Sequence, residues 1–177
     1  RFDSTYIQWV KIGESNRDMQ ITISPTCSAI AQQGVLLDYN FPGIYPDPAS
    51  GLPTVDYTCL DSAVTLHFAT KLDCSTISPD GTDFRLTAPN GQPIAVKSLV
   101  ANCDVNFETT SIVVKLHSPL AFNGKYFLYS KMGNDGTTLL NKCGFPMDEF
   151  DTIQLNVQGC FETVIDMKNV TIEKDEF

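Results

Sequence analysis

The sequence is poor in the residues that most catalytic and nucleic-acid-binding sites need. It contains two histidines and one tryptophan among 177 residues. Lys and Arg together number 12 against 21 Asp and Glu, so the formal net charge is −9. Because nucleic-acid binders gather cationic side chains on one surface, this charge argues against a nucleic-acid partner and against an anionic membrane surface.

Long apolar runs are also missing. No stretch approaches the roughly 20 apolar residues that a membrane-spanning helix needs, so we expect no membrane insertion. The sequence begins at Arg1 without an initiator Met, and we expect the chain to be a processed product or a piece of a longer protein.

Signals for catalysis are scarce as well. The chain has no G-x-S-x-G nucleophile motif, and its histidines, His67 and His117, lie within apparent strands, opposite the apolar face. A serine or cysteine nucleophile needs a base within reach, and disulfide-bonded cysteines are not nucleophiles. We therefore expect no enzymatic activity.

The cysteines indicate an oxidising compartment. The six cysteines are widely spread, and no two form a C-x-x-C pair. No histidine stands at metal-ligand spacing beside them either, so a zinc site is not expected. An even number of dispersed cysteines is typical of disulfides in an exported protein, so we expect an extracellular, cell-surface location. Fifteen pairings of six cysteines exist, and the count alone does not choose among them. The six are Cys27, Cys59, Cys74, Cys103, Cys143 and Cys160.

Period-two alternation of apolar residues dominates the chain, and no window shows a helical stripe. Short, β-branched stretches separated by Gly, Pro, Asn and Asp predict an all-β fold, an Ig-like antiparallel β-sandwich with flanking strands. The expected strands are Tyr6–Ile12, Met19–Ser24, Gly34–Tyr39, Ala63–Ala69, Thr82–Ala88, Ile94–Val100, Ser111–His117, Lys125–Ser130, Thr152–Val157 and Thr163–Ile172.

A proline-rich segment, Phe41–Pro53, is the best boundary in the sequence, because such a segment is stiff and does not enter a sheet interior. It divides the chain into an N-terminal β segment at 1–50 and a sandwich module at 54–160, with a C-terminal strand or linker at 161–177. The N-terminal segment holds too few strands for its own core, so it packs on the module or is the remnant of a preceding domain.

Strand direction suggests a disulfide pairing. In a sandwich whose strands alternate up and down, the first and third strands of the module end at the same pole. Cys74 and Cys103 follow those strands, so we expect a Cys74–Cys103 bond. Cys59–Cys143 and Cys27–Cys160 are then the remaining expected pairs.

The central part of the chain resembles a known family. Its features are the alternating strand Val64–Phe68, the stretch C-S-T-I-S-P-D-G-T-D-F ending at Phe84, the strands of Ser111–Lys131, and a D-G-T-T-L loop before Cys143. This order is similar to that of bacterial Ig-like domains repeated in large secreted surface proteins, including gliding-motility-associated and adhesin-like proteins. Residues 1–50 do not match. The resemblance implies a non-catalytic β-sandwich repeat that spaces or presents binding surfaces.

Calcium is the one cofactor that the residues suggest. It binds six to eight oxygens, several of them from carboxylates, and Asp80, Asp83 and Asp135 are the candidate ligands. The loop Asn134–Gly136 departs from the D-x-[DN]-x-[DN]-G pattern, and aspartates that cap turns explain the same residues without an ion.

The expected function is that of a structural or adhesive module of an extracellular bacterial surface protein. Its partners are a protein or glycan on a surface, or neighbouring copies of itself. One alternative is a filament or pilus-like subunit assembled by strand addition, for which Arg1–Ile12 and Thr163–Ile172 are the candidate strands. Another is a carbohydrate-binding module that uses Tyr39, Phe41 and Tyr45.

Overall fold

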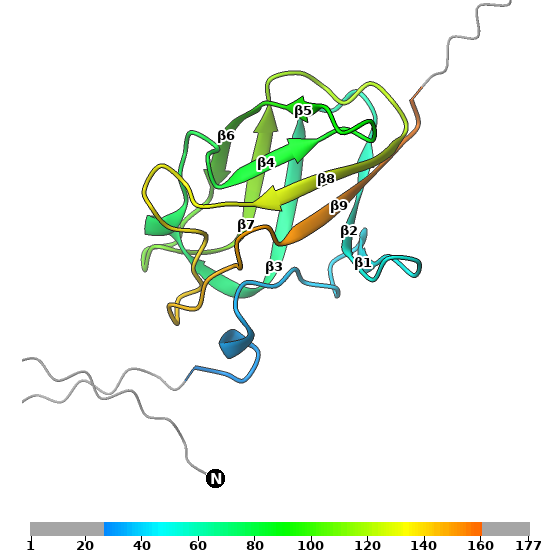
Figure 1. Cartoon of the computed structure of the whole chain (residues 1–177). Helices are drawn as coiled ribbons and strands as arrows, with labels where there is room; N and C mark the ends of the chain where they lie inside the picture. Colours follow the sequence, from blue (N-terminus) through cyan, green and yellow to red (C-terminus); the bar gives the residue numbers. More distant parts are fainter. Residues whose placement is uncertain (1–26, 161–177) are drawn as a thin grey trace, which may run out of the picture.

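Two β-sheets form the fold of the part that the computed structural model describes, residues 27–160 (Figure 1). The three-stranded sheet has the order β3 (Ala63–Asp73), β7 (Glu108–Leu116), β6 (Val96–Ala101). The six-stranded sheet has the order β1 (Ile44–Pro46), β2 (Pro53–Thr58), β9 (Thr152–Gln158), β8 (Gly124–Ser130), β4 (Phe84–Thr87), β5 (Pro93–Ile94). Two 3₁₀ turns, η1 (Ala31–Gln33) and η2 (Cys74–Thr76), are the helical elements of residues 27–160.

The core lies between the two sheets, where the alternating residues of each strand meet. Leu66 of β3 and Ile112 of β7 are fully buried and are register partners, and Leu128 of β8, in the other sheet, is 1% exposed and belongs to the same core. Full burial of one such side chain contributes about 2 kcal/mol to folding. The all-β sandwich predicted from period-two alternation is therefore confirmed.

One strand pair departs from the antiparallel expectation. β2 and β9 run parallel, with Val55 opposite Leu155 and Thr58 opposite Gln158. A parallel pair needs a long connection between its strands. Here nearly the whole sandwich intervenes, a relation that local patterning does not reveal.

The proline-rich segment 41–53 takes part in the sheet rather than lying outside it. Ile44–Pro46 forms an edge strand, and Pro46 pairs with Pro53 at the start of β2. Proline lacks an N–H, and it is tolerated at an edge and at the first residue of a strand. The sequence patterns did not predict either of these strands.

The stretch Gly34–Tyr39 is not a regular strand. Leu37 forms an isolated bridge to Phe68, and the Asp38 N–H donates to the His67 carbonyl at 2.9 Å. Val35, Leu37 and Ile44 nevertheless belong to the same core as the later strands. Residues 27–50 therefore pack on 54–160.

The expected strands Tyr6–Ile12, Met19–Ser24 and Thr163–Ile172 lie outside the described residues. Within 27–160, no helix has the length and apolarity required to cross a bilayer.

Candidate functional site

Three disulfides join all the cysteines. Cys74, directly after β3, is bonded to Cys103, which follows β6, as the strand directions predicted. The other two expected pairs are wrong, because the structure has Cys27–Cys143 and Cys59–Cys160. Cys160 reaches Cys59 because the parallel β2–β9 pair brings Thr58 and Gln158 together, so both strands end at one pole.

A buried asparagine positions the Cys27–Cys143 bond. Asn141 is 1% exposed, and its Nδ2 donates to the carbonyls of Ala31 at 2.6 Å and Gly34 at 2.9 Å. Its Oδ1 accepts from the backbone N–H groups of Cys143 at 2.9 Å and Phe145 at 3.1 Å. The side chain therefore holds the N-terminal stretch against the loop that carries Cys143. Sequence reasoning missed it, since nothing local distinguishes this asparagine from a turn residue.

The candidate calcium ligands lie on two adjoining loops. β4 and β8 are paired with Phe84 opposite Ser130, so the loop before β4 and the loop after β8 lie side by side. Asn134 joins them, since its Nδ2 donates to Asp80 Oδ2 at 2.7 Å and its N–H donates to Thr82 Oγ1 at 2.9 Å. We call these segments, 78–83 and 131–137, the acidic loops.

Asp83 is the most unusual residue of the acidic loops. Its side chain is 1% exposed, and Oδ2 accepts from the Ser78 N–H at 2.7 Å. Its Oδ1 has no hydrogen-bond partner among the described residues, and neither has the buried Ser78 Oγ. Burial raises the pKa of Asp83 to about 6. The Ser78 N–H and then the adjacent Ser78 side chain oppose this rise, and the charges of Asp135 and Asp80 add to it.

Asp80 has a different environment. Hydrogen bonds from the hydroxyl and N–H of Thr82, and then from Asn134, lower the pKa of this exposed carboxyl. Asp135 in turn accepts from the N–H and hydroxyl of Thr137, both at 3.0 Å. Both carboxylates thus have the turn-capping contacts expected of loop aspartates. Within 27–160, no three His, Cys, Asp or Glu side chains are grouped closely enough to share a metal ion.

Gly133 closes the space between the acidic loops. A Cβ built on it would lie 2.2 Å from Asp83 Oδ1, 2.4 Å from Ser78 Oγ and 2.9 Å from Asp135 Oδ1. Three side-chain oxygens from both loops therefore converge beside one Cα atom. Only glycine fits there without displacing them.

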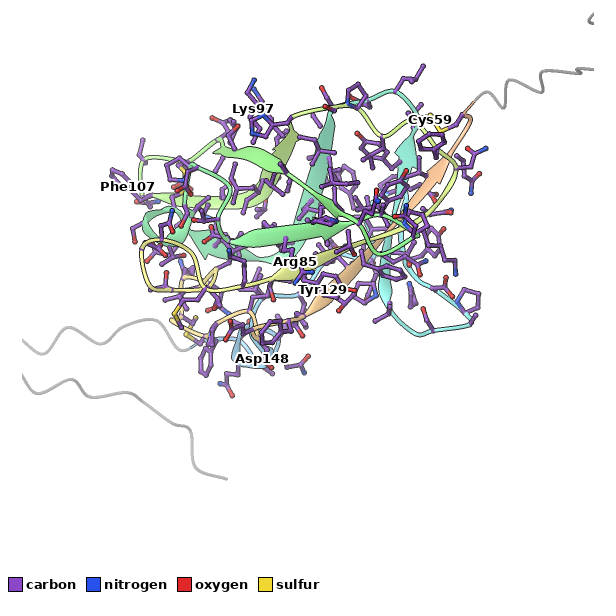
Figure 2. All side chains as sticks on the ribbon, turned by 45° about the horizontal axis from the view of Figure 1, so that its top comes forward. Cys59, Arg85, Lys97, Phe107, Tyr129 and Asp148 are labelled. Carbon is purple, nitrogen blue, oxygen red and sulfur yellow. A yellow bond between two sulfur atoms is a disulfide. The ribbon has the colours of Figure 1, made fainter. Side chains whose placement is uncertain are left out.

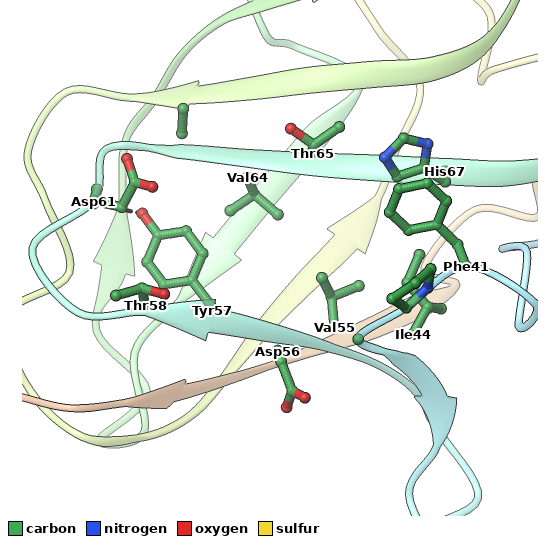
Figure 3. Close-up of a pocket in the computed structure, with 13 residues that line it drawn as sticks. Phe41, Ile44, Val55, Asp56, Tyr57, Thr58, Asp61, Val64, Thr65 and His67 are labelled. Carbon is green, nitrogen blue, oxygen red and sulfur yellow. Dashed lines mark hydrogen bonds between the residues drawn. The ribbon is translucent and has the colours of Figure 1, made fainter.

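A recess lies between β2 and β3 (Figure 3). Val55 and Val64 line it from opposite strands, and the Tyr57 hydroxyl at one end donates to the Asp61 carbonyl. At the other end Phe41 stacks on His67, with ring centroids 3.4 Å apart. Burial lowers the pKa of His67, and the nearby Asp38 opposes that effect.

Of the three candidate sugar-binding aromatics, Phe41 lines this recess. Phe41 is 40% exposed but has one ring face on His67. The Tyr45 hydroxyl contacts Asp56 Oδ1 at 2.9 Å and Asn156 Nδ2 at 3.2 Å. Tyr39 is the most exposed of the three, at 50%.

A buried carboxylate that sequence reasoning also missed fastens the β1–β2 loop. Asp47 is 6% exposed, and its Oδ2 accepts from Lys125 Nζ at 2.6 Å and from Gln154 Nε2 at 2.8 Å. The Lys125 and Gln154 hydrogen bonds hold the pKa of Asp47 well below its ordinary value. Asp47 stands in a P-D-P stretch, where a turn role is the usual expectation.

Apolar side chains on the loops could present contacts to a partner. Leu60, Phe107 and Phe150 each have a positive φ, an uncommon conformation for a bulky residue, and each is more than 60% exposed. Cys59, next to Leu60, and Phe107 lie at opposite ends of the sandwich (Figure 2). The described domain therefore displays exposed apolar residues at both ends.

Comparisons with known proteins give distant likenesses. No protein-family model matches the sequence, and no curated protein matches it. Among solved structures, the N-terminal part of the bacterial S-layer protein SbsC is similar at 18% identity and a TM-score of 0.43, over 62% of this chain and 24% of that one. CopC from Methylosinus trichosporium OB3b is similar at 10% identity and a TM-score of 0.32, over 60% of this chain and 87% of that one. At these TM-scores neither likeness supports an argument about function.

Proposed function

We propose that this chain is a non-catalytic structural or adhesive module of an extracellular bacterial surface protein. The three disulfides support an oxidising compartment. The β-sandwich supports the resemblance to Ig-like repeats of large secreted surface proteins, which rests on the motifs between Val64 and Gly144.

The observation that carries the proposal is the position of two disulfides. Cys27 precedes β1 and Cys160 follows β9, and each is bonded to a cysteine of the sandwich. The segment that precedes β1 and the C-terminal end of β9 lie on opposite sides of the sandwich (Figure 1). A pulling force that enters on one side and leaves on the other therefore meets a covalent crosslink at each side.

These crosslinks limit how far the module extends under tension. The Cys27–Cys143 bond closes a loop with a sequence separation of 116, so the shortest covalent path from Cys27 to Cys160 crosses this bond and then follows only residues 143–160. Since an extended chain spans at most about 3.5 Å per residue, this path extends to about 60 Å, against about 460 Å for the whole stretch without disulfides. Such a limit suits a module that spaces or anchors parts of a surface protein.

Single-molecule pulling on the whole chain tests this proposal. We expect a maximum distance from Cys27 to Cys160 of about 60 Å in the oxidised protein and of about 460 Å after reduction. The Cys27→Ser/Cys143→Ser double variant keeps only the Cys59–Cys160 bond near the ends. Its shortest path then follows residues 27–59, which extend to about 110 Å.

The matched control is Cys74→Ser/Cys103→Ser, which removes a bond that closes an internal loop with a sequence separation of 29. Because that loop lies off the shortest path, this variant should keep the limit of about 60 Å. Equal extension of the oxidised and reduced wild-type protein would overturn the mechanical role.

Assembly by strand addition is a second candidate, which an open strand edge favours. Leu36–Asp38 pairs with residues 67–69 and so covers that part of the outer edge of β3. Among residues 27–160, Thr65 is paired only with β7, so the outer edge of β3 is open at Thr65. The recess between β2 and β3 adjoins that edge. Sedimentation velocity from about 1 to about 100 μM tests this reading. Association that Thr65→Pro abolishes supports strand addition, and a monomer throughout the range argues against it.

A carbohydrate-binding role would depend on Tyr39 and the free face of Phe41. A glycan array with the wild type and Tyr39→Ala tests it. If neither protein binds any glycan on the array above background, the carbohydrate-binding role is excluded.

A further inference from the structure

Two oxygen atoms of the acidic loops are buried without a hydrogen-bond partner among residues 27–160. They are Asp83 Oδ1 and Ser78 Oγ, on side chains that are 1% and 5% exposed. Buried polar atoms are nearly always paired, because an unpaired one forfeits its interactions with water. The Asp83 carboxylate adds a formal charge, for which desolvation is costlier still.

These two oxygens point to a common place. Both lie within 2.4 Å of the position of a Cβ on Gly133, and Asp135 Oδ1 lies 2.9 Å from the same position. All three oxygens therefore lie within 2.9 Å of one point, and a cation that binds oxygen at about 2.3–2.6 Å needs such a convergence of oxygens.

Lys131 is the one basic residue of the acidic loops, and no ion pair joins it to a carboxylate within residues 27–160. The ion pairs found within 27–160 join Lys71, Lys125 and Lys142 to carboxylates elsewhere in the fold. Asp80, Asp83 and Asp135 therefore share a small region without a basic partner there. Burial of Asp83 is the main cause of its raised pKa, and the charges of Asp135 and Asp80 raise this pKa further.

From this convergence we propose that Asp83 Oδ1, Ser78 Oγ and Asp135 Oδ1 bind a calcium ion between the acidic loops. All three proposed ligands are oxygen atoms, the ligand type that calcium prefers, whereas zinc also binds nitrogen and sulfur ligands. Two carboxylates and a hydroxyl leave the remaining coordination positions to backbone oxygens and water. Asp80 is a positioning residue, because its hydrogen bonds to Thr82 and Asn134 hold the loops together. A site with few charged ligands binds weakly, with a Kd of about 0.1–1 mM, as in extracellular modules.

Calcium-dependent stability of the full 177-residue chain tests the proposal. Chelator-treated protein is unfolded with urea at pH 7.5 in EDTA, in 10 mM CaCl₂ and in 10 mM MgCl₂. With a Kd of about 1 mM, free calcium at about 10 mM lowers the unfolding equilibrium constant about 11-fold. Magnesium should have a smaller effect, because it demands a stricter octahedral geometry.

Neutral variants assign the effect to this site. Asp83→Asn and Asp135→Asn should abolish the calcium shift, whereas Asp148→Asn, at an exposed aspartate outside the acidic loops, should retain it. If Asp83→Asn does not fold, Ser78→Ala and Asp135→Asn test the same ligand set. The proposal is overturned if calcium does not change the stability of the wild type. It is also overturned if the calcium-dependent shift in stability persists in Asp135→Asn and in the second ligand variant, which is Asp83→Asn or, where that does not fold, Ser78→Ala. Because the pulling experiment depends on disulfides alone, its outcome is independent of this one.

Discussion

Replacing Asn141 should be among the most damaging single changes to a polar residue of this domain. Its side chain makes four hydrogen bonds, at 2.6–3.1 Å, to the backbone of Ala31, Gly34, Cys143 and Phe145. A net contribution of about 1 kcal/mol per bond gives about 4 kcal/mol. Water can recover part of that near the partly exposed Cys143 and Phe145. We therefore expect Asn141→Ala to lower the free energy of unfolding by about 3 kcal/mol.

Urea denaturation of the oxidised protein measures this loss. Asn141→Asp keeps the shape of the side chain but replaces the Nδ2 donor by an oxygen facing the Ala31 and Gly34 carbonyls. Its penalty should be larger at pH 7 than at pH 3.5, where a protonated carboxyl can donate again. Asn106→Ala, at an exposed asparagine, is the control and should change stability by less than about 0.5 kcal/mol. A loss below about 0.5 kcal/mol for Asn141→Ala would refute the reasoning.

Other contacts of the fold can be tested in the same way. Hydrogen bonds from Lys125 and then Gln154 hold the folded-state pKa of Asp47 below its ordinary value of 3.8, so the stabilisation they give is present above that value and is lost as the pH falls. The urea midpoint of Asp47→Asn should therefore be lower than that of the wild type at pH 7 and should drop less on acidification. An equal drop in the two proteins would contradict this. Gly133→Ala should destabilise by about 1–3 kcal/mol, because its Cβ would lie 2.2 Å from Asp83 Oδ1; unchanged thermal unfolding would mean that the acidic loops can move apart. Non-reducing peptide mapping should recover three linked pairs, which are Cys27–Cys143, Cys59–Cys160 and Cys74–Cys103. Any other linkage would show this disulfide arrangement to be wrong.

The sequence alone was enough for the fold class and for much of the sandwich. Alternation is a local property, so the apolar faces of strands such as Ala63–Ala69 and Ser111–His117 could be identified from neighbours two residues apart. The structure has β3 and β7 there, with Val64, Leu66, Ile112 and Val114 in the core. The Cys74–Cys103 bond was predictable for a related reason, since it needs only the directions of strands close in sequence.

Short edge strands were not predictable in the same way. Ile44–Pro46 is too short and too rich in neighbouring prolines to show alternation, and it is held by pairing with β2. Gly34–Tyr39 shows the opposite case, because it has strand-like residues but makes only a bridge at Leu37. In both places tertiary packing overrode the local preference of the chain.

What the tertiary structure decided is which distant segments meet. The parallel β2–β9 pair selected Cys59–Cys160, and the Asn141 hydrogen bonds accompany Cys27–Cys143, although the two bonds have sequence separations of 101 and 116. The pairing of β4 with β8 likewise brought Asp83 beside Gly133 and Asp135. The sequence supplied the aspartates as candidates. Only the fold could bury one of them and leave its oxygen without a partner, because burial is a property of the whole packed domain.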